Sequence, residues 1–298
     1  AFSYCMKLES VTIPNSVTHI GRSAFSDCYK LASLTIPNKL KYIGHWAFHR
    51  CHSLTTLVVP DSVSYIDEYA FGNCEGLENL TLGSSLVVIG ETAFSGCEVL
   101  QSITIPDSVK TIESSAFSGC SAVTSIKIGK GVISISPYAF LGCKEVATVI
   151  VDSKNEVYDS RENSNAIIET ETNILVFGTK ATIIPDSVTE IGRYAFYECV
   201  NLENIELSDN ITAIGEYAFY RCSGLNTIVI PESVVNVGRY VFRRCANLKI
   251  FAEVTELPET WDSNWSEGIP VYWYSEAPNS DGSHWHYVGG IPAIWPAE

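Results

Sequence analysis

Residues 97–119 read CEVLQSITIPDSVKTIESSAFSG, and this stretch decides the fold because the chain repeats its pattern along most of its length. Cys120 opens the next copy, and eight of the nine gaps between successive cysteines are 23 residues long. The ninth gap, from Cys143 to Cys199, is 56 residues, which is one repeat plus 33. A fixed internal period of this length is typical of solenoid proteins.

Each 23-residue unit carries about eight apolar positions, more than a single unit can bury. Aligned on cysteine as position 1, the unit reads C-x-x-L-x-x-L-x-I-P-x-S-V-x-x-I-G-x-x-A-F-x-x. The L-x-x-L-x-I segment ends in the alternation typical of a short strand, and the proline ends it because proline cannot donate to a sheet ladder. We therefore predict a β-rich (α/β-type) solenoid of 23-residue repeats, with parallel strands and one shared hydrophobic core.

This pattern resembles the BspA-like leucine-rich repeats of bacterial cell-surface proteins, and the resemblance covers residues 1 to about 251. The chain differs from the commoner leucine-rich consensus, because serine stands where that consensus has asparagine. The resemblance implies an extracellular or cell-surface protein that mediates protein–protein interaction or adhesion to host or neighbouring cells. It also implies a protein ligand, such as a host matrix or cell-surface protein.

Composition narrows the classes of function. The formal net charge of −15 makes nucleic acid an unexpected partner, because phosphate binding requires a basic face. No apolar run is long enough to span a membrane. The chain lacks a nucleophile elbow, a phosphate loop and a zincin helix, so we expect no enzyme activity and no cofactor. It opens on the tail of a repeat motif, and we expect any export signal to lie outside this fragment.

The ten cysteines allow two interpretations, a disulfide framework or a column of free thiols. Equivalent cysteines on adjacent coils would lie about 4.8 Å apart with parallel Cβ vectors. A disulfide requires Cβ atoms about 3.8 Å apart. A straight ladder also lacks the converging geometry of a metal site. We therefore predict free, buried thiols that act as small apolar residues.

An insertion at residues 152–181 breaks the period. Residues 166–168 and 174–177 have the character of two short strands, which predicts a β-hairpin that projects from the solenoid. Its carboxylates could supply oxygen ligands to Ca²⁺, although a solvated acidic loop is the favoured interpretation. Because insertions in solenoids often mark the binding face, Asp159, Arg161 and Glu162 are candidate contacts.

The composition changes after Phe251, and residues 252–298 hold five of the six tryptophans. Residues 271–276 and 284–288 alternate as strands do, and residues 279–283 between them have turn chemistry typical of a hairpin. We predict a solenoid at residues 1–251 and a tryptophan-rich β cap at residues 252–298 that covers the last apolar layer. The alternative is a carbohydrate platform of tryptophan faces. His284 and His286 are weak evidence for a metal site.

Four outward columns are candidates for function. The residues at positions 6 and 8 are mostly small, which β-propensity explains, although a smooth binding groove is the alternative. The aromatic column at position 19 is interpreted as packing between coils. Position 11 forms an acidic rim that would favour a basic partner. The rim candidates are Asp61, Asp107, Asp186, Asp209 and Glu232.

We expect the chain to be a monomer. Besides protein binding, two further hypotheses of function stay open. One is a glycan-binding module or an architectural stalk that carries another domain. The other is an enzyme with the repeats as a recognition scaffold, although no pair of carboxylates stands out for glycoside hydrolysis.

Overall fold

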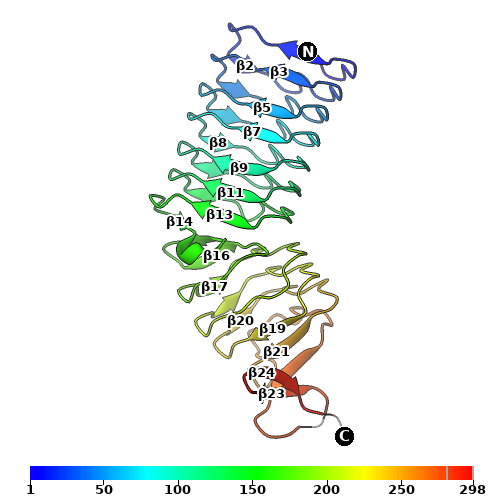
Figure 1. Cartoon of the computed structure of the whole chain (residues 1–298), viewed down its shortest axis with the longest axis vertical. Helices are drawn as coiled ribbons and strands as arrows, with labels where there is room; N and C mark the ends of the chain where they lie inside the picture. Colours follow the sequence, from blue (N-terminus) through cyan, green and yellow to red (C-terminus); the bar gives the residue numbers. More distant parts are fainter. Residues whose placement is uncertain (280, 297–298) are drawn as a thin grey trace. The chain divides into compact units, whose positions relative to one another are not determined.

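The computed structural model describes residues 1–279 and 281–296, and it divides into two compact units, Ala1–Ser160 and Arg161–Glu298. Within each unit, successive coils place their strands one above the other in columns (Figure 1). The predicted solenoid of 23-residue repeats with parallel strands is confirmed. No helix in the described parts of the chain has the length and apolar character needed to cross a membrane.

Two columns of strands run through unit 1. The first column contains β1 (Ser10–Thr12), β3 (Ser33–Thr35), β5 (Thr56–Val58), β7 (Asn79–Thr81), β9 (Ser102–Ile105), β11 (Ser125–Ile128) and β13 (Thr148–Val151). The second column contains β2 (His19–Ile20), β4 (Tyr42–Ile43), β6 (Tyr65–Ile66), β8 (Val88–Ile89), β10 (Thr111–Ile112) and β12 (Ser134–Ile135), and β14 (Tyr158–Asp159) follows β13 in the chain. Ser10 pairs with Ser33 and Thr111 with Ser134, so the strand register equals the sequence repeat.

The A-F segment of each repeat forms tight turns, and these turns are also bonded from coil to coil. The backbone N–H groups of Trp46, Phe48 and Arg50 donate to carbonyl oxygens of the next coil at 3.0, 2.7 and 2.9 Å. Trp46 and Arg50 adopt left-handed φ angles of 56° and 59°, and the same two repeat positions are left-handed in most other coils. Hydrogen bonds therefore join neighbouring coils along the turn side as well as through both strand columns.

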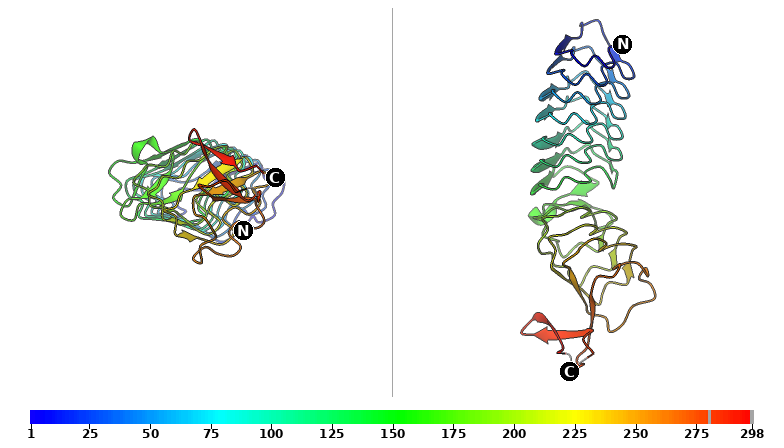
Figure 2. Two further views of the ribbon diagram at one scale, coloured as in Figure 1. Left: turned by 90° about the horizontal axis from the view of Figure 1, so that it is seen from below. Right: turned by 90° about the vertical axis from the view of Figure 1, so that its right-hand side faces the viewer.

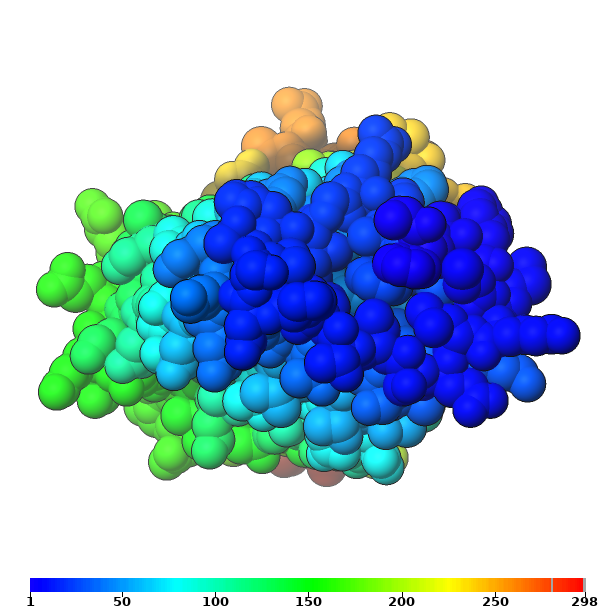
Figure 3. Space-filling view, turned by 90° about the horizontal axis from the view of Figure 1, so that it is seen from above, coloured from blue at the N-terminus to red at the C-terminus, as the bar shows by residue number. Residues whose placement is uncertain are grey.

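A ladder of phenylalanine rings forms the centre of the unit 1 core. The rings of Phe25, Phe48, Phe71 and Phe94 stack with centroids 5.2–5.4 Å apart and nearly parallel planes. The last three are fully buried, and burial of each such ring contributes about 1.5–3 kcal/mol. The coil at the N-terminal end, dark blue in Figure 3, is different because its Phe2 remains half exposed.

The cysteines form a second ladder beside the phenylalanines. The thiol of Cys51 donates to the carbonyl oxygen of Phe25 at 3.4 Å, and seven other cysteines make the same contact 26 residues back. All ten cysteines are free, and all except Cys5 are buried, so the predicted thiol column is confirmed. Burial raises the pKa of Cys74, Cys199 and Cys245 to about 12.

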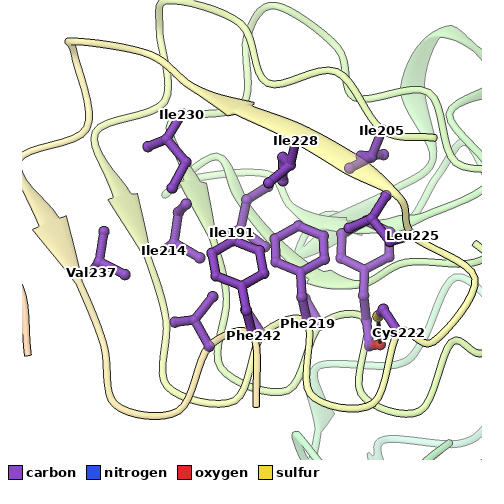
Figure 4. Packing of buried hydrophobic residues seen from close by; sticks show 14 of the residues in the cluster. Ile191, Ile205, Ile214, Phe219, Cys222, Leu225, Ile228, Ile230, Val237 and Phe242 are labelled. Carbon is purple, nitrogen blue, oxygen red and sulfur yellow. Dashed lines mark hydrogen bonds between the residues drawn. The ribbon is translucent and has the colours of Figure 1, made fainter. Parts of the chain in front are cut away.

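Unit 2 repeats the architecture after the insertion. Its elements up to the last repeat are η1 (Arg161–Asn163), β15 (Ile167–Glu169), β16 (Ile174–Phe177), β17 (Glu190–Ile191), β18 (Ala213–Ile214), β19 (Thr227–Ile230), β20 (Asn236–Val237) and β21 (Lys249–Ala252). Figure 4 shows its core, in which Phe219 and Phe242 lie beside aliphatic side chains such as Ile214 and Val237. The core of unit 2, like that of unit 1, is therefore built from equivalent side chains of successive coils.

The hairpin predicted in the insertion is confirmed, because β15 and β16 pair in antiparallel fashion with Ile167 opposite Phe177. The expectation that it projects from the solenoid is wrong. β16 also pairs in parallel with β17, which makes it a member of the second column. Ile167, Ile168 and Leu175 are fully buried, because the apolar residues of this insertion join the core.

Parallel pairing continues beyond the last repeat. β22 (Val271–Tyr274) pairs in parallel with β21, and β23 (His284–Val288) pairs in parallel with β22. The prediction of a hairpin formed by residues 271–276 and 284–288 is therefore wrong. Ser280, which belongs to the turn predicted for that hairpin, lies outside the described residues. The antiparallel partner of β23 is β24 (Ile291–Ile294), and Gly289 and Gly290 between them have φ angles of 58° and 83° (Figure 2). Two consecutive left-handed residues suit a tight hairpin turn.

Tryptophans close the core of unit 2, as the cap interpretation predicted. Trp265 packs edge-on against Phe242 at 5.9 Å and so ends the phenylalanine ladder. Trp261 is buried and donates its indole N–H to the carbonyl oxygen of Val234 at 3.2 Å. Because these indoles and that of Trp285 are buried, they offer no flat face for a sugar, whereas Trp273 and Trp295 remain partly exposed, so the carbohydrate platform keeps only part of its support.

Removal of one ring from the phenylalanine ladder should destabilise unit 1. We expect Phe94→Ala to lower the free energy of unfolding by about 3–5 kcal/mol, because it leaves a cavity between two stacked rings. Urea denaturation followed by circular dichroism measures the change. Val87→Ala, at an exposed position in the same repeat, should stay within about 0.5 kcal/mol. Equal losses in both variants would contradict the ladder as the stabilising element.

The thiol ladder predicts a sharp split in reactivity. In the native chain only the exposed Cys5 should react within minutes with an aromatic disulfide reagent, because the other nine thiols are buried out of reach of the reagent. After denaturation all ten thiols should react. The variant Cys5→Ser should lose the fast phase. Several fast-reacting thiols in the folded, unmodified chain would mean that the cysteine column is open to solvent.

Candidate binding groove

A groove of about 720 Å³ lies on the strand face of unit 2, between the last coils and the C-terminal hairpin. Three segments line it: residues 204–209, the outward face of β19 and β21, and the hairpin formed by β23 and β24. The residues that present charged or large side chains to it are Glu206, Asp209, Val229, Lys249, Phe251, Glu253, Tyr287, Ile291, Pro292 and Ile294. Its volume is in the range of pockets that bind small ligands or a few side chains of a protein.

The hairpin is held against the last coil by contacts that begin in the buried cap. The indole N–H of Trp285 donates to the carbonyl oxygen of Ala252 at 2.9 Å. The ring of Phe251 lies between Tyr272 and Trp285, with a centroid distance of 5.4 Å to each. Nearer the surface, the Tyr287 hydroxyl donates to Glu253 at 2.6 Å. The wall of the groove is therefore fixed by packing and by hydrogen bonds at two depths.

The floor of the groove is chemically different from the strand face of unit 1. Repeat position 8 of unit 1 is mostly threonine, with Val58, Lys127 and Ile150 as exceptions, and it holds no carboxylate and no aromatic ring. Glu206 stands at this position in unit 2, and Val229 and Phe251 follow in the next two coils, paired in register. Glu206 lies in a segment that forms no strand, whereas Val229 and Phe251 are paired residues of β19 and β21, so the backbone of this column also differs from that of unit 1.

Carboxylates outnumber cations in the groove. Glu206, Asp209 and Glu253 face one ammonium group, that of Lys249. Burial and the hydrogen bond to Glu253 raise the pKa of Tyr287, so its hydroxyl stays protonated at neutral pH. Ile291 is 70% exposed at the edge, which adds an apolar surface beside the negative charge.

One residue of the predicted acidic rim lines this groove, and a second bonds to a lining residue through its backbone. Asp209 lines it, and the backbone N–H of Glu232 donates to the carboxylate of Glu253 at 3.2 Å. Asp186 is exposed in unit 2 but is not among the lining residues. The rim as a binding surface stays a prediction.

The rim residues of unit 1 have a structural role. Asp61 accepts a hydrogen bond from the backbone N–H of Ser84 at 2.7 Å, and Asp107 accepts one from Lys130 at 3.2 Å. Both acceptors bond to the same position of the next coil, and these bonds lower the pKa of both carboxyl groups. An ion pair with the Lys130 ammonium at 3.3 Å further engages Asp107.

The candidate contacts of the insertion fall at the boundary between the units, with Asp159 in unit 1 and Arg161 and Glu162 in unit 2. The Arg161 guanidinium donates to Asn173 at 2.8 Å and to Ser187 at 3.2 Å, which orders the insertion. Across residues 1–279 and 281–296, no three His, Cys, Asp or Glu side chains converge to hold a metal ion. His284 instead contacts Asp281 at 2.9 Å.

Sequence reasoning missed the residues of the groove wall. Ile291, Pro292 and Ile294 follow a Gly-Gly pair, and the sequence 289–294 alone signals a turn followed by a short strand. This strand comes to lie opposite β19 and β21 because β22 and β23 pair in parallel. The turn residues between β22 and β23 instead predicted an antiparallel hairpin.

A model of the BspA type leucine-rich repeat region matches this chain over residues 1–99, 64–172 and 177–260. The chain belongs to the BspA-type leucine-rich-repeat family. The resemblance inferred from the repeat pattern is therefore confirmed. No curated protein shows significant similarity to this BspA-type chain.

Solved structures share the fold. A leucine-rich cell surface protein of Faecalibacterium prausnitzii is 30% identical, with a TM-score of 0.69, over 91% of this chain and 80% of that protein. A leucine-rich repeat protein of Bacteroides ovatus is 26% identical, with a TM-score of 0.51, over 88% and 70% of the two chains. A leucine-rich repeat protein of Eubacterium ventriosum is 20% identical, with a TM-score of 0.65, over 85% and 69%, which shows likeness of fold.

Proposed function

We propose that this BspA-type chain is an extracellular or cell-surface binding protein that holds a protein ligand in the groove of unit 2. The observation that carries the proposal is the juxtaposition of three carboxylates with exposed apolar side chains in one preformed concavity. The similar protein of Faecalibacterium prausnitzii is described as a cell surface protein, which supports the location. A role in adhesion to host or neighbouring cells follows as the use of such binding.

The groove selects a ligand that combines basic and apolar groups. A lysine or arginine of the partner would face Glu206 and Asp209, and an adjacent apolar side chain would cover Ile291. Complementary charge speeds association and rejects acidic partners, while burial of the apolar contact provides affinity. A basic segment of a host matrix or cell-surface protein has this chemistry.

A protein ligand is favoured over a glycan because of where the tryptophans lie. Recognition of sugars by stacking needs exposed ring faces, whereas Trp261, Trp265 and Trp285 are buried in the cap, and the ring of the partly exposed Trp295 is stacked on His286 at 3.5 Å. The proposal assigns the groove to binding, with no catalytic step.

Charge reversal in the groove should weaken ligand binding. We expect Glu206→Lys combined with Asp209→Lys to reduce the affinity for a basic matrix protein by about 10-fold or more, as for charged residues at the centre of an interface. Biolayer interferometry of the purified chain against an array of matrix proteins and glycans identifies the ligand and measures the loss. Ile291→Asp should weaken binding by a similar factor.

The matched control is the double reversal Asp61→Lys and Asp107→Lys, which changes charge equally on the rim of unit 1. Retained affinity in this control, with loss in the groove variants, supports the groove. Because Asp61 and Asp107 also bond to the next coil, the control must keep the native melting temperature; loss of binding in such a folded control alone would transfer the site to the rim, and unchanged binding in all variants would refute both. Selective capture of glycans on the array would favour the alternative function.

A further inference from the structure

A cluster of tyrosine and arginine side chains covers the turn side of unit 2, apart from the groove residues. The tyrosines of this Tyr–Arg face are Tyr194, Tyr197, Tyr217, Tyr220 and Tyr240. Its arginines are Arg193, Arg221, Arg239, Arg243 and Arg244, which are five of the eight arginines in the chain. All of them come from repeat positions 18, 19, 22 and 23 of three successive coils.

The fold does not require these residue types. The same four positions hold Ser114, Ser115, Ser118 and Gly119 in a coil of unit 1. The hydrogen bonds that stitch the coils at this side come from the backbone, as where the N–H of Tyr217 donates to the Arg239 carbonyl oxygen at 3.0 Å. The backbone bonds between coils therefore do not fix the residue types at these four positions.

Two of the arginines occupy backbone positions that favour glycine. Arg221 and Arg244 have left-handed φ angles of 57° and 65°, at the repeat position filled by Gly96 and Gly119 elsewhere. A side chain in this region of φ carries a conformational cost that glycine avoids. Asp27, Arg50, Asn73 and Glu198 stand at the same repeat position with φ angles of 55–59°, so this backbone accepts side chains in several coils.

The tyrosine rings present their edges to solvent. Tyr194 and Tyr217 stack at 5.2 Å with planes 6° apart, and Tyr197 and Tyr220 stack at 4.7 Å with planes 13° apart. Stacking uses the electron-rich faces, and all four rings remain partly exposed. The edge of an aromatic ring is electropositive, so this surface favours anionic groups over the flat face of a sugar.

The arginines complete a positive surface. Arg239 lies over the ring of Tyr240 at 4.4 Å and donates to its hydroxyl oxygen at 2.8 Å, which leaves the hydroxyl hydrogen for an external acceptor. Ion pairs engage three of the arginines with Glu198, Glu216 and Glu267. Within the described residues, Arg239 and Arg244 contact aromatic rings and have no carboxylate at ion-pair distance. Five guanidinium groups thus outnumber three carboxylates on a chain of net charge −15.

We propose that the Tyr–Arg face is a second interaction surface, and that its partner is an acidic polypeptide segment. Tyrosine and arginine are the residue types most enriched at binding hot spots between proteins. A polypeptide supplies carboxylates for Arg239 and Arg244 and apolar side chains for the ring edges. The interspersed Glu198 and Glu216 would repel a uniformly sulfated chain, so the mixed charge favours a protein over a sulfated glycan.

The test uses the whole purified chain and two immobilised probes, a synthetic peptide alternating glutamate with phenylalanine and serine, and a heparin oligosaccharide. Biolayer interferometry should detect binding to the peptide, and replacement of its glutamates by lysine should abolish it. Arg239→Glu combined with Arg244→Glu should lower the affinity by about 10-fold or more. The affinity should also fall with added salt because exposed charges are screened.

Two variants control for folding and for charge. Arg22→Glu reverses a charge at repeat position 18, the position of Arg239, but in the first coil of unit 1, and it should retain full affinity. Arg244→Gly suits the left-handed backbone, so it should keep the melting temperature and still lose affinity. Absence of peptide binding, or equal loss in Arg22→Glu, would overturn the proposal. Preferential binding of heparin with the same dependence on Arg239 and Arg244 would overturn the choice of a polypeptide.

Discussion

Parallel stacking in a constant register is the constraint on which every other feature of this chain depends. A single 23-residue coil has strands of only two to four residues, and its backbone groups are bonded mainly to the coils before and after it. Buried polar groups without partners are costly, so a coil that shifts its register by one residue would lose the hydrogen bonds at its strands and its turns together. The phenylalanine and cysteine ladders follow the same register, because each ring stacks on the equivalent ring of the next coil and each thiol donates to a phenylalanine carbonyl oxygen 26 residues back.

The same register explains how a solenoid with little chemical variety inside produces distinct surfaces outside. Inward positions repeat almost without change, because stacked rings must match in size and place. Outward positions share the backbone hydrogen bonds between coils but need no matched side chain in the next coil, so their residue types vary. Thr104 and Glu206 stand at the same repeat position, position 8, in different coils. Ser115 and Tyr217 likewise share repeat position 19. Surface chemistry can therefore differ between coils while the register stays the same.

The C-terminal hairpin couples stability to binding. An open stack of coils leaves its last apolar layer exposed, and Trp261, Trp265 and Trp285 cover that layer in unit 2. The strand that brings Trp285 into the core also brings Tyr287 to Glu253, and β24 then forms the wall of the groove. The groove is thus a consequence of closing the core, and its rigidity derives from the packing of the cap.

The sequence by itself determined the repeat, the parallel register and the free thiols, because a strict 23-residue period places equivalent side chains at equivalent places. It also identified Asp209 and Glu232 as outward acidic residues, although it could not show that Asp61 and Asp107 bond to the next coil. Tertiary structure alone decided the partners of β16 and β23, since local turn signals report the direction of the chain and not the strand that lies beside it. It decided the groove and the Tyr–Arg face for the same reason. Both surfaces depend on which side chains meet across coils. The sequence lists the residue at each repeat position, but it does not state whether an aromatic ring exposes its face or its edge.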